Sequence, residues 1–290
     1  DKVIRREIKI KEQENYSGTK IKKSKNFINR RNYFEFVNIK EVPSKDKPNY
    51  LDLEVEVEEK PTGYFSIQGG YSSVEALLLG VQIQENNLFG YGKSLGASVT
   101  VGTVSQNFLI DYFDPYFLDT SYQFGLQLFK REYQYIDYDR ARWGGVLQFG
   151  KELNTWTFAR LKYRFESIKV DDLNSVATEV LQESKDKISS VTLGLTYDTR
   201  DNFMDPSKGI SSSLYIQESN SYLGANLHFT EYTASFGKYY SFIPNHTLAF
   251  TADGAFIDFR NVGDRLIVSE RYYLGAVSYT HLTLPTMIRV

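Results

Sequence analysis

The sequence predicts a mainly β protein, an antiparallel transmembrane β-barrel preceded by a small α+β unit. Three observations support this prediction. Helical periodicity is confined to the residues before Pro61. After Pro61, about eleven segments of some ten residues alternate apolar and polar side chains with the two-residue period of a membrane-spanning strand. Aromatic residues make up 15% of the chain, with 22 Tyr and 20 Phe, and such side chains suit the interfacial girdles of a membrane protein.

The first sixty residues predict an α-α-β-β unit. Residues 2–11 and 18–32 each carry apolar side chains at helical spacing among charged ones. Residues 37–42 and 51–57 then alternate with a period of two, on either side of a loop rich in Pro, Ser and Lys. We therefore expect two short helices followed by a two-stranded hairpin in a domain of residues 1–60.

Beyond this unit, the alternation predicts a sheet with one apolar and one polar face. In a barrel, one set of side chains would face lipid: Leu161, Tyr163, Leu193 and Leu195. The alternate set would face the lumen: Arg160, Arg164, Thr192 and Thr196. In a soluble β-sandwich the same alternation would place the apolar face in a core, so periodicity alone leaves that alternative open.

The links between the strands favour the barrel. Every second link is compact and rich in turn residues, at residues 86–92, 114–117, 150–154 and 242–245. The intervening links are expected to be longer, at residues 132–142 and 171–187. Short turns on one side and long loops on the other are typical of an outer-membrane barrel.

Composition excludes several other classes of protein. The net charge of -2 and the pI near 6.0 argue against nucleic acid as a partner. The mean hydropathy is -0.39, and no apolar run approaches the ~18 residues of a membrane-spanning helix. The chain has no Cys, so disulfides and thiolate metal sites are excluded.

No catalytic motif is recognisable. The sequence has no nucleophile elbow, zinc-binding helix or phosphate-binding loop, and His228 fits an ordinary strand position. We therefore expect no enzyme activity and no cofactor.

A cluster of acidic residues raises the possibility of a Ca²⁺ site, because hard cations prefer carboxylate oxygens. The cluster comprises Asp198, Asp201, Asn202 and Asp205. The favoured alternative is a structural turn, in which Arg200 neutralises adjacent carboxylates and Gly209 supplies a positive φ. We therefore predict no metal.

Three basic residues of one expected strand would face the lumen: Arg160, Lys162 and Arg164. They would either line a path for ions or, as we favour, be solvated or paired residues of the barrel wall.

Five segments carry a resemblance to one family. They are VEVEEKPTG at 55–63 followed by GGYSS at 69–73, ENNLFGYG at 85–92, DPYF at 114–117, YDTRDN at 197–202 and SERYYLG at 269–275. In this order they resemble the BamA-like outer-membrane protein assembly factors. The first segment resembles the junction between the last POTRA domain, a periplasmic module, and the first barrel strand.

The resemblance implies a domain plan and some departures from it. Residues 1–60 correspond to a last POTRA domain without its first strand, and residues 61–276 to about 11 of the roughly sixteen strands of the family's barrel. The family's Arg-Gly loop motif is not reached. Residues 277–290 resemble a translated adapter tail and are excluded from the fold argument.

The resemblance also implies a function, the folding and insertion of β-barrel proteins into the outer membrane. An inserting strand needs an edge that satisfies its backbone groups. The candidate edge is the first barrel strand: Tyr64, Phe65, Ser66, Ile67, Gln68, Gly69, Gly70 and Tyr71. Gly69 and Gly70 would either weaken its pairing or merely relieve crowding in the wall. A second candidate is the POTRA edge strand: Val37, Asn38, Ile39, Lys40, Glu41 and Val42. The resemblance also identifies a turn motif of the family, formed by Asp198, Thr199, Arg200, Asp201, Asn202 and Gly209.

The implied partners are nascent outer-membrane proteins, periplasmic chaperones, outer-membrane lipoproteins of the assembly complex and outer-membrane lipid. The implied location is the outer membrane, with the N-terminal part in the periplasm. Two other functions stay open. A two-partner secretion transporter of the same superfamily would share the domain plan, and a passive porin would share the barrel without the N-terminal unit.

Overall fold

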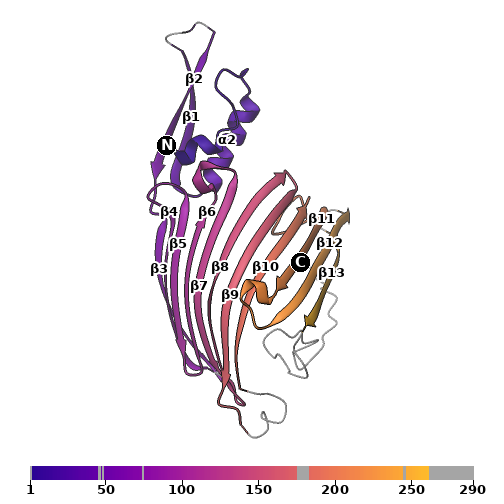
Figure 1. The fold of residues 1–290 in the computed structure, drawn as a ribbon. Coiled ribbons are helices and arrows are strands. Elements are labelled where there is room, and N and C mark those ends of the chain that lie inside the picture. Colours follow the sequence, from indigo (N-terminus) through magenta and orange to yellow (C-terminus); the bar gives the residue numbers. More distant parts are fainter. Residues whose placement is uncertain are drawn as a thin grey trace.

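The computed structural model describes residues 2–44, 47, 49–73, 75–174, 183–243 and 246–260. Over these residues it forms a small N-terminal unit at one end of a large curved sheet (Figure 1). The unit consists of α1 (Lys2–Glu7), α2 (Gly18–Arg30), β1 (Phe34–Pro43) and β2 (Leu51–Glu59). The sheet consists of β3 (Gly63–Ser72), β4 (Ala76–Leu88), β5 (Lys93–Gly102), β6 (Ser105–Asp114), β7 (Tyr122–Gln134), β8 (Asp139–Asn154), β9 (Thr157–Asp171), β10 (Ser184–Asp198), β11 (Gly209–Ser219), β12 (His228–Ile243) and β13 (His246–Arg260).

The large sheet is an antiparallel meander in which each strand pairs with its neighbours in sequence, in the order β13 to β3. This confirms the predicted mainly β fold and the expected number of strands, 11 among the described residues. The sheet is curved but not closed over these residues, so β3 and β13 are its two edges (Figure 1).

The N-terminal unit has the predicted α-α-β-β order, with differences at the element ends. The Ser17 side chain caps α2 by accepting a hydrogen bond from the Lys20 backbone N–H. Helix α1 ends at Glu7 rather than at residue 11, and β1 begins three residues earlier than predicted. A core forms where the helices meet the hairpin, from the buried side chains of Val3, Ile21, Ile28, Tyr33 and Val37.

The alternation of the strands produces the two predicted faces. Leu161 pairs in register with Leu193, and both are exposed on the outer face, at 44% and 61%. Thr192 lies on the other face and is only 5% exposed. The inner face is not uniformly polar, however. Away from the N-terminal unit, Ile168, Ile188 and Phe229 form a buried cluster that Leu227 completes. Leu227 belongs to the link before β12, so this link covers part of the inner face.

The predicted difference in link length is wrong in part. Strands β7 and β8 extend into the segment expected as a long loop, and only residues 135–138 separate them. On the side expected to carry short turns, the link between β10 and β11 spans residues 199–208. Polar residues such as Arg131 and Arg140 pair across β7 and β8 with Arg142 and Tyr133, so a polar stretch did not mark the end of a strand.

Three predicted features lie outside the described residues: the family segment SERYYLG at residues 269–275, the adapter-like tail at residues 277–290, and the centre of the link between β9 and β10 at residues 175–182. No helix among the described residues is long and apolar enough to cross a membrane.

Candidate functional site

The first strand of the sheet, β3, is paired on one side only among the described residues. Its register with β4 runs from Gly63 opposite Glu85 to Ser72 opposite Ala76. No described strand lies on its other side, so the backbone N–H and C=O groups of that side form an open edge. The predicted templating residues, 64–71, all lie within this strand.

The side chains of β3 alternate between the two faces of the sheet. Phe65, Ile67 and Tyr71 project on the outer face and are 62%, 72% and 83% exposed. On the inner face, Gln82 of β4 donates a hydrogen bond to the Tyr64 hydroxyl at 3.2 Å. The strand is therefore amphipathic across its width, as a membrane-spanning strand requires.

The two adjacent glycines of β3 are not crowded by the described residues. A Cβ added to Gly70 would meet no described atom within 4 Å, and one added to Gly69 would only touch Leu79 at 3.8 Å. Within this part of the chain, nothing requires glycine for space. The alternative in which these glycines relieve crowding therefore has no support from the described neighbours. The predicted effect that remains is a weakened strand, because glycine lacks a side chain and loses more entropy on ordering.

The N-terminal hairpin offers a second pair of edges. Strands β1 and β2 pair with each other and form a two-stranded sheet. The predicted capture residues, 37–42, lie in β1, where Val37 is buried and Lys40 forms an ion pair with Glu56 of β2. Both strands are open on their outer sides within the described residues. The structure therefore does not favour β1 over β2.

The family turn motif forms a self-contained loop between β10 and β11. The Arg200 guanidinium donates to both carboxylate oxygens of Asp198, at 2.6–3.1 Å, as the sequence predicted. The Asp201 carboxylate accepts hydrogen bonds from the backbone of Asn202, Ser207 and Lys208 and from the Ser207 hydroxyl. These bonds hold the pKa of Asp201 far below its ordinary value. Both carboxylate oxygens of Asp201 thus accept hydrogen bonds from the loop itself.

Gly209 ends this loop with a backbone that only glycine adopts without strain. Its φ is +114°, and a Cβ there would lie 2.7 Å from Cα of Arg200. Thr199 closes the loop, because its backbone N–H donates to Ile210 C=O at 2.8 Å and its hydroxyl accepts from Ile210 N–H at 2.9 Å. The motif therefore acts as a rigid connection. Among the described residues, no group of three or more His, Asp or Glu side chains is placed to hold a metal ion.

A buried polar cluster joins the N-terminal unit to the sheet, and sequence reasoning missed it. Glu7 of α1 is 3% exposed and forms an ion pair with Arg31 at 2.6 Å. The Tyr116 hydroxyl, from the link between β6 and β7, donates to Glu7 at 3.3 Å and accepts from Arg31 at 3.2 Å. Tyr116 lies in the DPYF segment, which resembles the family but has no role assigned from the sequence. This resemblance is the sequence signal that could have pointed to the cluster.

Further contacts surround this cluster. Lys2 and Arg6 both form ion pairs with Asp119, and the Arg6 guanidinium lies over the Tyr116 ring, 4.7 Å from its centroid. The two basic groups lower the pKa of Asp119 through hydrogen bonds to its carboxylate. Burial raises the pKa of Tyr116, so its hydroxyl stays protonated and donates. The N-terminal unit is thus held on the turns next to the β3 side of the sheet.

The inward basic residues of β9 are partly paired. Glu166 is 2% exposed and accepts ion pairs from Arg142 at 3.3 Å and Arg164 at 3.5 Å. The Arg160 guanidinium lies 5.4 Å from the centroid of the Phe158 ring. These contacts favour paired wall positions over an ion path.

Comparison with known families matches both parts of the chain. The family described as Omp85 superfamily domain matches residues 87–279, and the POTRA family, described as surface antigen variable number repeat, matches residues 1–60.

Curated relatives match at moderate identity. An outer membrane protein assembly factor BamA from Nitratidesulfovibrio vulgaris is 27% identical over 96% of this chain and 35% of its own length. The factor of the same name from Neorickettsia risticii is 28% identical over 72% of this chain and 29% of its own length. The chain thus spans about a third or less of the curated relatives it matches.

Solved structures share the fold. BamA from Haemophilus ducreyi lacking POTRA domains 1–3 has a TM-score of 0.70 at 18% identity, covering 90% of this chain and 53% of that one. CdiB from Acinetobacter baumannii has a TM-score of 0.54 at 12% identity, covering 93% of this chain and 52% of that one.

Proposed function

Because the chain belongs to the Omp85 superfamily, we propose that it acts within an outer-membrane protein assembly factor and that β3 is the edge on which a client strand pairs. Its relatives are outer-membrane proteins with periplasmic POTRA domains. The sheet of this chain accordingly lies in the outer membrane, and residues 1–60 lie in the periplasm.

The open backbone edge of β3 carries the proposal. A client strand that enters hydrocarbon with unpaired N–H and C=O groups would incur a cost of several kcal/mol per group. Pairing with β3 would satisfy half of those groups by β-augmentation. Exposed Phe65, Ile67 and Tyr71 would then continue the lipid-facing surface of the client.

The implied clients are nascent outer-membrane proteins. The edges of β1 and β2 would receive periplasmic chaperones, assembly lipoproteins or clients before insertion, by the same pairing chemistry. The step requires no cofactor and no bond cleavage, and we propose no enzyme activity.

A matched pair of cysteine variants tests the role of β3 in the full-length protein. The chain has no Cys, so any disulfide that a single introduced cysteine forms with a client can be assigned to that position. Ser66 of β3 and Ser98 of β5 lie at the same level on the same face, since both flank Gln82 of β4 in register. Ser98 is in a strand paired on both sides.

We expect S66C to form a disulfide with a cysteine in the inserting strand of a porin client, because strand neighbours fall within the ~4.4–6.8 Å Cα separation of disulfides. S98C should not. Equal trapping by both variants, or no trapping by S66C while the protein still inserts the client, would show that β3 is not the templating edge.

A second candidate function is the secretion of a polypeptide through the lumen, which the likeness to CdiB structures favours. In that case a passing polypeptide would contact the inner face of the wall. Ser66, Ser98 and Thr196 are all inner-face positions, so cysteines at all three would then trap a secreted polypeptide alike, whereas templating by β3 predicts trapping by S66C and not by S98C.

A further inference from the structure

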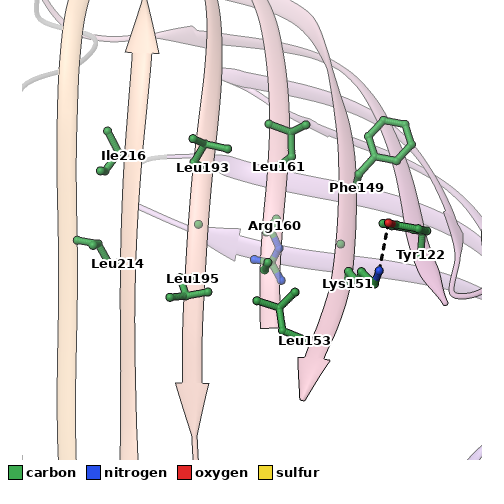
Figure 2. Close-up of a pocket in the computed structure, with 13 residues that line it drawn as sticks. Tyr122, Phe149, Lys151, Leu153, Arg160, Leu161, Leu193, Leu195, Leu214 and Ile216 are labelled. Atoms are coloured by element: carbon green, nitrogen blue, oxygen red, sulfur yellow. Dashed lines mark hydrogen bonds between the residues drawn. The ribbon is translucent and has the colours of Figure 1, made fainter. Parts of the chain in front are cut away.

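An apolar groove crosses the outer face of the sheet over β8, β9, β10 and β11 (Figure 2). Its volume is about 460 Å³, within the ~300–1,000 Å³ range of small-molecule sites. None of the residues around it takes part in the proposed strand pairing, because β3 lies five strands away from β8.

The register of the strands explains why the surface is hollowed here. One row across the wall reads Lys151, Ala159, Leu195 and Leu214, and the next row reads Phe149, Leu161, Leu193 and Ile216. Ala159 has the smallest side chain in either row. Ala159 therefore forms the floor of the groove, and the larger leucine and aromatic side chains around it form the sides. Such an apolar surface favours contact with a hydrocarbon chain.

Two basic residues line the groove: the Arg160 guanidinium lies against the Phe158 ring, and the Lys151 ammonium stands at one end of the groove. The Lys151 ammonium donates to the Tyr122 hydroxyl at 3.1 Å and lies 4.4 Å from the centroid of its ring (Figure 2). No carboxylate is paired with it among the residues that the structure describes. The hydroxyl and the ammonium thus form a pair of donors suited to a phosphate oxygen.

The position of this pair along the strands matches a membrane interface. Tyr122 is the first residue of β7, and Lys151 lies three residues before the end of β8, on the side of the sheet that carries the N-terminal unit. Trp156 follows in the next turn and is 50% exposed. Tyr and Trp mark the interface, and a lysine stem lies along apolar surface with its charge in the headgroup layer.

We propose that this groove binds one glycerophospholipid of the periplasmic leaflet. Its phosphate is held by Lys151 and Tyr122, and one acyl chain lies over Ala159. The site rests on the membrane location of the sheet and does not depend on the proposed templating by β3. It would fix the lipid at the middle of the wall, where the sheet is paired on both sides.

Two variants test the two halves of the site in the full-length protein. K151Q removes the charge, and A159F fills the floor of the groove. Each has a matched control on the same outer face: Lys238 of β12, an exposed lysine outside the groove, as K238Q, and Ala97 of β5, between Ile83 and Ile110, as A97F. Binding of phosphatidylglycerol to the detergent-purified protein is measured by native mass spectrometry.

We expect one tightly retained lipid per wild-type molecule, about tenfold weaker binding in K151Q because a charge-assisted hydrogen bond is lost, and none in A159F. K238Q and A97F should stay within about twofold of the wild type. If A159F does not give a heat-modifiable barrel, K151Q decides the matter alone.

Three outcomes would overturn the proposal. Equal retention in all variants would mean annular lipid only. Equal losses in the control variants would mean non-specific binding. Displacement of the lipid by inorganic phosphate at matched concentration would mean that the donors hold a free anion rather than a lipid headgroup.

Discussion

The first strand of the sheet and its middle strands differ in length and in their side-chain bonds. Within the described part of the chain, strand β3 has 10 residues and pairs with β4 alone, whereas β9 and β10 have 15 residues each and are paired on both sides. The middle strands add the Glu166 ion pairs and the buried cluster around Ile188. In contrast, none of the described side chains of β3 is buried.

This difference indicates where the sheet opens first. Local opening begins where few buried contacts hold the chain, and β3 is an edge of the described sheet with no buried side chain among its described residues. The middle of the sheet then stays ordered while its edge exchanges partners. An assembly factor needs both properties, because a templating edge must release its product without loss of the barrel.

The largest expected effect contrasts two isoleucines. Ile188 is 0% exposed, and Ile67 is 72% exposed. Ile188→Ala should lower the free energy of unfolding by about 2–5 kcal/mol through cavity formation, and Ile67→Ala should cost less than about 1 kcal/mol. Urea unfolding of the full-length protein in lipid vesicles measures both. Equal costs would show that edge and middle contribute alike to stability.

A second effect concerns the rigid turn between β10 and β11. Gly209→Ala should destabilise the protein by about 1–3 kcal/mol, because its φ of +114° strains an L residue and the new Cβ would press on the Arg200 backbone. The thermal midpoint of heat modifiability provides the measurement. An unchanged midpoint would mean that the loop shifts at little cost.

Sequence periodicity predicted the strands because alternation is a local property of ten residues at a time. The two faces around Leu161 and Leu193, and the start of the sheet at Gly63, follow from it. The ends of β7 and β8 did not follow from it, since strands that carry polar side chains also pair with each other, as Arg131 does with Arg142.

The junction cluster could not be predicted in the same way. Glu7, Arg31 and Tyr116 lie up to 109 residues apart in sequence, and each is a residue type that is usually exposed. The covered part of the inner face was missed for the same reason, because Leu227 comes from a link that no strand pattern includes. The position of the β3 edge followed from the sequence, and its templating role remains a proposal.

A third effect sharpens the role of the β3 glycines. Gly70→Ala should stabilise the edge by about 0.5–1 kcal/mol, because alanine loses less backbone entropy and its Cβ meets no described atom. Hydrogen exchange of the β3 amides should slow, and disulfide trapping of a client through S66C should slow with it.

Gly80 of β4 provides the control for this variant. Its strand is paired on both sides, and an added Cβ there would make only ordinary contacts, at 3.5 Å or more. Gly80→Ala should therefore leave client trapping unchanged. If it slows trapping as much as Gly70→Ala does, general rigidity of the sheet, rather than the edge, controls the exchange.

The smallest effect concerns the contact that holds the N-terminal unit on the β3 side of the sheet. Hydrogen bonds from Lys2 and Arg6 lower the pKa of Asp119. A carboxyl group whose pKa is lowered by docking favours docking at every pH above its ordinary pKa of about 3.9, and this contribution disappears as the pH falls through the lowered value. Docking should therefore be constant from pH ~7 to ~5 and weaken below pH ~4.

Spin labels on cysteines at Lys22 of α2 and Thr247 of β13 would report this docking as an interlabel distance distribution, in the otherwise cysteine-free full-length chain. Asp119→Asn should broaden the distribution at neutral pH and remove its change with acid, while Asp52→Asn in the exposed hairpin should do neither. Because Asp119 is exposed, added salt should weaken the contact as well. A distribution that stays narrow in Asp119→Asn would assign the docking to Glu7, Arg31 and Tyr116 alone. The β3 side would then be held by buried contacts that moderate acid and salt leave in place.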